Sequence, residues 1–300
     1  MYEYHKPVLL KESVDALIDS PDGIYADATF GGGGHSREIL RRLSPKGRLV
    51  AFDRDADALK GAMEDERFTL IHNNFRFIHN YCLSLCPEGF DGILADLGVS
   101  SHQFDTAERG FSFRYDAPLD MRMNTQASLT AEDVVNTYGT DALERIFRIY
   151  GEVENAHRLA LLIGGKRSAS PIHTTFELDK AIEEATPKFA GHKYLAKVYQ
   201  ALRIEVNQEM RSLEKFLEGA AKSLKKGGRL SVITYHSLED RMVKNFIKAG
   251  NMEGTVEKDI YGCCDTPFEA VNRKPILPCE EEISGNTRAR SAKLRIAVKR

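Results

Sequence analysis

A run of four glycines constrains this chain more than any other feature of its sequence. The run, Gly31 to Gly34, lies in the segment DATFGGGGHS, between a predicted strand at residues 24–29 and a predicted helix at residues 35–43. Successive glycines give up side-chain packing and add backbone freedom that folding must remove. They are tolerated where the chain bends as only glycine allows, or where a ligand comes close to the backbone. A glycine-rich turn from a first strand into a first helix is typical of nucleotide sites.

Strand and helix patterns alternate through the N-terminal third of the chain. Further buried strands are predicted at residues 49–52, 68–71 and 93–95, with helices at residues 55–63 and 76–85. Short turns between alternating elements favour a parallel sheet that is covered by helices on both faces.

A long helical region interrupts this alternation. No strong strand pattern is found in residues 106–200, and one long helix is predicted at residues 193–224. Strand patterns return at residues 230–234 and 293–299. We therefore predict an α/β fold with an inserted all-helical domain, in which residues 1–105 and 201–300 form one domain and residues 106–200 form the insertion.

Two aspartates end predicted strands of the sheet. Asp53 follows the second strand and Asp96 the fourth. Because ligands bind at the carboxyl ends of strands in this architecture, both carboxylates are candidates for a site. Asp53 is placed to accept hydrogen bonds from ribose hydroxyls, and Phe75, after the third strand, to pack on an adenine ring. Helix or turn capping by the aspartates and a core position for Phe75 are the alternatives.

Two kinds of nucleoside ligand suit the glycine turn. A dinucleotide would put its pyrophosphate there, and S-adenosylmethionine its amino-acid end. The dinucleotide fingerprint G-x-G-x-x-G, started at Gly31, needs a glycine where the chain has Ser36, and no Gly-Lys-Ser/Thr follows. The residues therefore indicate a nucleoside and count against a nucleotide-dependent oxidoreductase.

Composition and charge leave the partner open. The net charge is −2, and the last 30 residues hold eight basic and three acidic side chains, which suit either a solvated surface or an RNA contact. Neither a signal peptide nor an apolar run long enough to span a bilayer is found, so we expect a cytoplasmic protein without a membrane partner. The five cysteines include no C-x-x-C pair, which argues against a structural zinc site, and we expect no metal.

Seven motifs in order make the chain similar to a known family. It resembles the small-subunit ribosomal RNA cytosine-N4 methyltransferases, the RsmH or MraW family, from about His5 to Val298. The chain departs from the family's pattern at Ala28, at Gly32 and in HKYLAKVY (His192 to Tyr199), where an arginine of the family is absent. The motifs that carry the resemblance are DATFGGGGHS, DLGVSS, ERGFSF, PLDMRM, QALRIEVNQEM, YHSLEDRMVK and NTRARSAKLR, together with the opening HKPVLL.

The resemblance implies both a fold and an activity. The fold is that of class I, Rossmann-like methyltransferases that depend on S-adenosylmethionine, with the helical insertion after the fourth strand. The activity is methylation of the exocyclic N4 amine of a cytidine in the decoding region of small-subunit ribosomal RNA, within the assembled small subunit. The cofactor residues that the resemblance carries over are Gly33, Gly34, His35, Asp53, Phe75, Asp96 and Gln103.

This chemistry gives roles to Asp96 and to one further candidate. A cytosine amine is a weak nucleophile and a sulfonium methyl is already activated, so the protein's tasks are positioning and removal of a proton. We expect Asp96 to accept a hydrogen bond from the amine. His236, after the fifth strand, either takes the proton or holds the base, or is a hydrogen-bonded histidine at a helix start. A non-catalytic RNA-binding assembly factor with the same fold is the alternative function.

The inserted helices are the candidate surface for RNA, and also for a homodimer. Interleaved basic and aromatic residues suit phosphate contact and base stacking. An internal salt bridge is the alternative for each arginine. The candidates are Arg109, Arg114, Arg122, Phe111, Phe113 and Tyr115, with Arg288, Arg290 and Lys293 near the C-terminus.

Overall fold

The computed structural model describes residues 7–256 and 266–300, so that His5 and Lys6 of the opening motif lie outside the described residues. The chain divides into two compact units. The first consists of residues 1–98 and 210–300, and the second of residues 99–209. The predicted insertion, residues 106–200, falls within the second unit.

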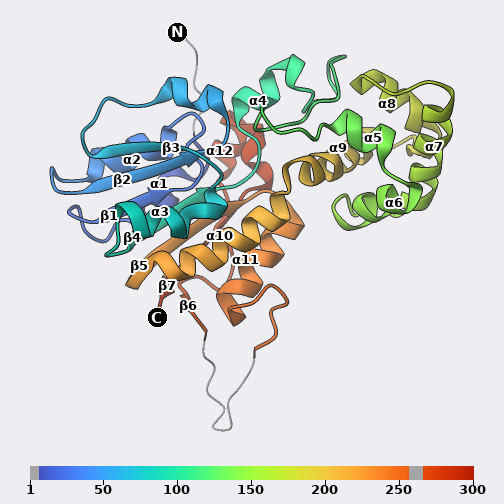
Figure 1. Ribbon diagram of the computed structural model, residues 1–300. Coiled ribbons are helices and arrows are strands. Elements are labelled where there is room, and N and C mark those ends of the chain that lie inside the picture. The colour runs from blue at the N-terminus through green and yellow to red at the C-terminus, as the bar shows by residue number, and fades with distance from the viewer. Residues whose placement is uncertain (1–6, 257–265) are drawn as a thin grey trace. The chain divides into compact units, whose positions relative to one another are not determined.

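A seven-stranded sheet forms the centre of the first unit (Figure 1). Its strand order is β3-β2-β1-β4-β5-β7-β6, and β1 to β5 pair in parallel while β7 runs antiparallel to both β5 and β6. The predicted α/β class is confirmed, and the chain order reverses between β1 and β4, which is where such sheets bind ligands. The strands are β1 (Ile24–Asp27), β2 (Arg48–Asp53), β3 (Phe68–His72), β4 (Phe90–Asp96), β5 (Leu224–Thr234), β6 (Phe268–Ala270) and β7 (Lys293–Lys299).

Helices cover both faces of this sheet. Alternate residues of β1 enter different cores: Ala26 packs in the cluster that includes α3, α10 and α11, and Tyr25 in the cluster that includes α1 and α2. The two-sided burial explains why these strands read as continuous apolar runs. The helices are α1 (Leu10–Leu17), α2 (Gly34–Arg42), α3 (Ile78–Leu85), α10 (Glu209–Ser223), α11 (Ser237–Ala249) and α12 (Glu280–Gly285).

Two predicted helices differ from the structure. The helix predicted at residues 55–63 is a short 3-10 helix, Ala56–Gly61, capped by the Asp55 side chain, and none of its residues is buried against a core. The long helix predicted at residues 193–224 is broken, because Gln208 adopts a left-handed backbone conformation with φ of 48° between α9 and α10. A continuous apolar pattern hid this break.

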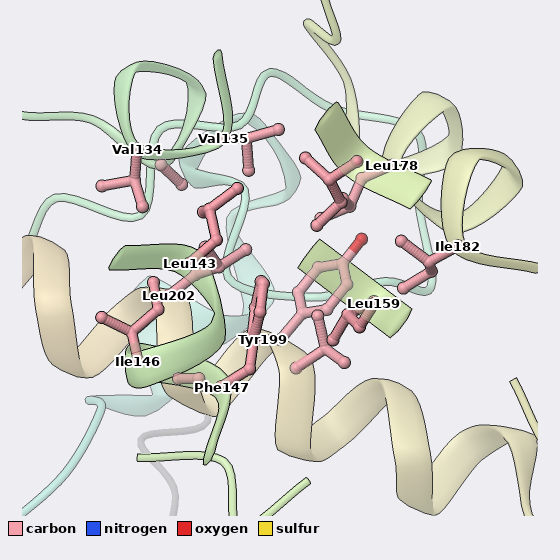
Figure 2. Packing of buried hydrophobic residues seen from close by; sticks show 14 of the residues in the cluster. Val134, Val135, Leu143, Ile146, Phe147, Leu159, Leu178, Ile182, Tyr199 and Leu202 are labelled. Atoms are coloured by element: carbon pink, nitrogen blue, oxygen red, sulfur yellow. The ribbon is translucent and has the colours of Figure 1, made fainter. Parts of the chain in front are cut away.

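Helices pack around a separate core in the second unit. Figure 2 shows Leu143, Phe147, Leu159, Tyr199 and Leu202 converging there from α6, α7 and α9. Capping boxes begin α5, at Thr130, and α8, at Thr174. The helices are α4 (Ser101–Asp105), α5 (Ala131–Thr137), α6 (Thr140–Ile149), α7 (Ala156–Ala169), α8 (Thr175–Ile182) and α9 (Gly191–Asn207). Within residues 7–256 and 266–300, no helix has the length and apolarity that a membrane span needs.

Candidate active site

The glycine turn joins β1 to α2, and a side chain would meet a close neighbour at two of its positions. Gly33 has a φ of 74°, and a methyl group there would lie 2.9 Å from the Phe30 ring. A methyl group at Gly34 would lie 2.8 Å from Pro7. Gly33 is the N-cap of α2, and no side chain caps this helix. The turn therefore brings the backbone N–H groups and partial positive charge of a helix start to the carboxyl edge of the sheet.

A buried aspartate fastens this turn from behind. Asp27, the last residue of β1, is fully buried, and its carboxylate accepts hydrogen bonds from the Ser36 hydroxyl (2.6 Å) and the Thr29 N–H (3.1 Å). Burial raises the pKa of Asp27. These bonds fix the first turn of α2 to the end of β1. Both partners lie within the DATFGGGGHS motif, but the sequence did not indicate that Asp27 and Ser36 bond to each other.

Asp53 ends β2, as predicted, and contacts the glycine turn. Its Oδ2 accepts the Gly31 N–H at 2.7 Å and its Oδ1 accepts the Asp55 N–H at 2.8 Å. Burial raises the pKa of this carboxyl group. Each carboxylate oxygen has a second lone pair, so both can accept a further hydrogen bond, as from the two hydroxyls of a ribose.

Phe75 follows β3 in a short 3-10 helix, Phe75–Phe77. Its ring meets Phe216 edge to face, with centroids 5.2 Å apart, and is partly exposed. The neighbouring Phe77 ring lies under the Arg76 guanidinium at 4.7 Å and is 37% exposed. Phe75 is thus held by the core of the first unit while part of its ring stays accessible, as an adenine contact requires.

Asp96 ends β4 and is anchored at both its backbone and its side chain. Its N–H donates to the Thr29 hydroxyl at 2.6 Å, and its Oδ1 accepts a hydrogen bond of 2.7 Å from the Tyr235 hydroxyl. Burial raises the pKa of Asp96 to about 6, against the opposing effects of His35 and Tyr235. The group is therefore mostly ionised at neutral pH, and can accept a proton under mildly acidic conditions.

His35 lies beside Asp96, whereas His236 turns elsewhere. The His35 Nδ1 is 3.8 Å from Asp96 Oδ2, and its Nε2 lies 3.1 Å from the Val8 carbonyl oxygen. His236 caps α11: its Nδ1 accepts the Glu239 N–H at 3.4 Å, and its Nε2 lies 3.1 Å from Glu239 Oε1. The contacts of His236 are thus those of a hydrogen-bonded histidine at a helix start. The residue that reaches Asp96 is the adjacent Tyr235, which the sequence analysis missed.

Gln103 and the RNA candidates between Arg109 and Arg122 lie in the second unit, whereas Arg288, Arg290 and Lys293 lie in the first. Gln103 closes the capping box of α4, where its Oε1 accepts the Ser100 N–H at 3.1 Å. Arg109 is buried and donates to the carbonyls of Arg122 and Met123. Arg122 forms a salt bridge to Asp120. Both Arg109 and Arg122 thus form contacts within the second unit.

Comparison with known proteins identifies the family. The model of the MraW methylase family matches residues 2–300. The chain belongs to this family. Among its relatives, the ribosomal RNA small subunit methyltransferase H of Bacteroides fragilis is 56% identical over 297 residues, which cover 99% of this chain and 98% of the relative. The protein of the same name from Flavobacterium johnsoniae is 57% identical over 297 residues, which again cover 99% of this chain and 98% of the relative.

The MraW-family chain is an enzyme, a methyltransferase, and its methyl donor is S-adenosylmethionine. Among solved structures, it is similar to an rRNA methylase from Streptococcus thermophilus, at 13% identity with a TM-score of 0.42, over 97% of this chain and 93% of the other. The family model and the relatives confirm the predicted family and cofactor.

Proposed function

We propose that this protein transfers a methyl group from S-adenosylmethionine to the exocyclic N4 amine of a cytidine in the decoding region of small-subunit ribosomal RNA. The observation that carries the proposal is Asp96, a partly buried carboxylate beside the glycine turn. The names of the relatives support the substrate class. The alternative, a non-catalytic assembly factor, is not favoured.

The residues at the sheet edge fit S-adenosylmethionine. The turn at Gly33 leads into a helix start without a side-chain cap, and the N–H groups of such a start suit a carboxylate. The partly buried Asp53 carboxylate suits the ribose hydroxyls, and the partly exposed Phe75 suits the adenine. We assign the cofactor to Gly33, Gly34, His35, Asp53, Phe75 and Asp96, and Gln103 stays a prediction that rests on the family resemblance. The cofactor supplies a methyl group that its sulfonium already activates.

Asp96 has the properties that the acceptor amine needs. The lone pair of the amine is delocalised into the cytosine ring. When the amine donates a hydrogen bond to a carboxylate, the lone pair becomes more localised on the nitrogen, which makes the nitrogen a better nucleophile. The target base must leave its stack to reach such a group. Once the nitrogen has gained a methyl group, its proton is strongly acidic, so a carboxylate with a pKa near 6 suffices as the acceptor.

Two histidines are candidates for the residue that finally accepts this proton. With Nε2 bonded to the Val8 carbonyl, a neutral His35 leaves the Nδ1 lone pair on the side of Asp96 and can take a proton there. His236 stays a second candidate, held by Glu239 at the start of α11. The His35 geometry makes it the stronger of the two.

The second unit offers an exposed aromatic pair for RNA. Tyr115 is 55% exposed and Phe176 is 49% exposed. The Thr175 hydroxyl donates to the Tyr115 carbonyl at 2.7 Å, and the Phe176 N–H donates to Asp116 at 3.3 Å, so the two segments are fixed side by side. With the exposed Arg114, these rings suit stacking of unpaired bases and a phosphate contact.

Further features of the proposal concern the particle and the cell. The assembled small subunit is the proposed substrate form, which would make the cytoplasm the site of action. A homodimer through the inserted helices stays a prediction that light scattering after gel filtration checks.

Transfer of labelled methyl groups tests the proposal. The protein is incubated with labelled S-adenosylmethionine and either small subunits or naked ribosomal RNA from a strain that lacks this modification, and the RNA is digested to nucleosides. Labelled N4-methylcytidine from the subunits is the expected product. Label in another nucleoside, or no label although the cofactor binds, contradicts the proposal.

A further inference from the structure

We propose that Tyr235 is a positioning residue for methyl transfer. Its hydroxyl fixes the Asp96 carboxylate so that one oxygen, Oδ2, is presented to the acceptor amine. This inference rests on the proposed function and adds a residue that the cofactor and catalytic assignments above do not include.

Tyr235 reaches Asp96 because of strand pairing. Asp96 pairs with Ile233 in the β4–β5 register, and Tyr235 follows β5 directly. The Leu97 N–H donates to the Ile233 carbonyl at 2.9 Å, which continues the pairing past the end of β4. The tyrosine side chain thus emerges beside Asp96, and its hydroxyl meets Oδ1 at 2.7 Å.

Tyr235 is itself held from two sides. Its backbone N–H donates to Glu239 Oε2 at 2.9 Å, and Glu239 is buried in the first turn of α11. The Tyr235 ring is partly buried and packs against the cluster that includes Val8, Leu9 and Ile233. Little freedom is left for the hydroxyl, so its hydrogen bond orients the carboxylate and not the reverse.

The two oxygens of Asp96 consequently differ. Oδ1 accepts the tyrosine hydroxyl, whereas Oδ2 has no hydrogen bond within the part of the chain that the structure describes, and its neighbour His35 Nδ1 is 3.8 Å away. Oδ2 is therefore the oxygen with room for a donor. The charged or titratable groups that act on this carboxylate are His35 on α2, Asp27 on β1, Tyr235 after β5 and Glu239 on α11.

A positioning role makes a distinct prediction about pH. A hydrogen bond to the ionised carboxylate favours that form, so its removal raises the pKa of Asp96. The variant Tyr235→Phe keeps the ring and removes only the hydroxyl. The matched control is Tyr25→Phe, which removes a buried hydroxyl of the same unit that donates to the Ser20 carbonyl at 2.8 Å, with no contact to Asp96.

Three measurements on the full-length protein test the role: kcat with small subunits between pH 5 and 9, the Kd for S-adenosylmethionine, and the titration of Asp96 by carbon-13 NMR. For Tyr235→Phe we expect kcat at pH 7.5 to fall roughly ten- to a hundredfold. The Kd should stay within about twofold, because no cofactor contact is assigned to the hydroxyl. The acid limb of kcat and the Asp96 titration should both move to higher pH. Tyr25→Phe should match the wild type in all three.

Two results would overturn the role. One is a wild-type kcat in Tyr235→Phe. The other is a lower kcat with an unchanged Asp96 titration, because a purely structural effect would produce it. If the wild-type protein transfers no methyl group to cytidine, the proposed function fails and the role falls with it, and the NMR titration alone then reports whether the contact exists.

Discussion

Asp96→Asn should make the protein more stable while it abolishes or greatly weakens methyl transfer. Burial raises the pKa of Asp96 from an ordinary 3.8 to about 6, so the folded state holds the ionised form at a cost. A difference of about two pKa units corresponds to roughly 3 kcal/mol of free energy of unfolding at neutral pH, at about 1.4 kcal/mol per unit. The asparagine avoids this cost because it carries no charge.

The surroundings of Asp96 accept an amide. Its oxygen can take the Tyr235 hydroxyl in place of Oδ1, and its nitrogen can face His35 Nδ1, which is an acceptor while Nε2 donates to the Val8 carbonyl. No donor is forced against another donor. The exchange therefore keeps the hydrogen bonds of the site while it removes the charge.

The sign of the pH dependence follows from the direction of the shift. Because the folded-state pKa is raised, the folded protein binds the proton more tightly than the unfolded chain between pH 3.8 and about 6, and the wild type loses stability as pH rises through this window. The advantage of Asp96→Asn should thus be about 3 kcal/mol at pH 7.5 and roughly half of that at pH 5.

Urea unfolding of both proteins at the two pH values measures this difference. The raised pKa values of Asp27 and Asp53 change the stability of both proteins alike, so the comparison isolates Asp96. An asparagine variant that is less stable than the wild type at pH 7.5, or whose gain is equal at both pH values, would refute the reasoning.

Three further predictions concern the cofactor and RNA residues. Gly33→Ala should lower the free energy of unfolding by about 1 kcal/mol or more beyond the loss in Gly227→Ala. Both positions have a positive φ, but of these two only Gly33 has a side chain, Phe30, within 4 Å of an added methyl group. Thermal unfolding compares the two variants, and equal losses would contradict the close approach. Asp53→Ala should weaken S-adenosylmethionine binding by roughly tenfold or more in calorimetry, because two hydrogen bonds to a charged acceptor are lost; unchanged affinity would remove Asp53 from the cofactor site. Tyr115→Ala should weaken binding of small-subunit RNA by about 1–3 kcal/mol in a filter assay at fixed salt without changing cofactor affinity, whereas unaltered RNA binding would exclude its stacking role.

Much of the fold and part of the site follow from sequence periodicity. Local patterns place Asp53 and Asp96 at strand ends, and a parallel sheet then brings these ends to one edge. The glycine turn was recognisable for the same reason, since strand, turn and helix are neighbours in the chain. These predictions depend on residues that are close together in the sequence.

The remaining features depend on contacts that no local pattern encodes. The Tyr235–Asp96 hydrogen bond joins residues 139 positions apart, and only the β4–β5 register brings them together. Tyr235 directly precedes the predicted His236 in a motif where both side chains can carry chemistry, and no local pattern distinguishes the two. The sequence left Arg122 open between an RNA contact and an internal salt bridge, and only the structure shows its pairing with Asp120 and its bond to the Ala127 carbonyl. The break at Gln208 was hidden because the apolar positions stay in phase across it.

The central claim is that the carboxylate of Asp96 serves methyl transfer to a cytidine amine. The most direct measurement is transfer from labelled S-adenosylmethionine to small subunits, by the wild type and by Asp96→Asn, after both are shown to be folded. The account predicts labelled N4-methylcytidine with the wild type, and little or none with the more stable variant. Equal transfer by the two proteins would contradict it.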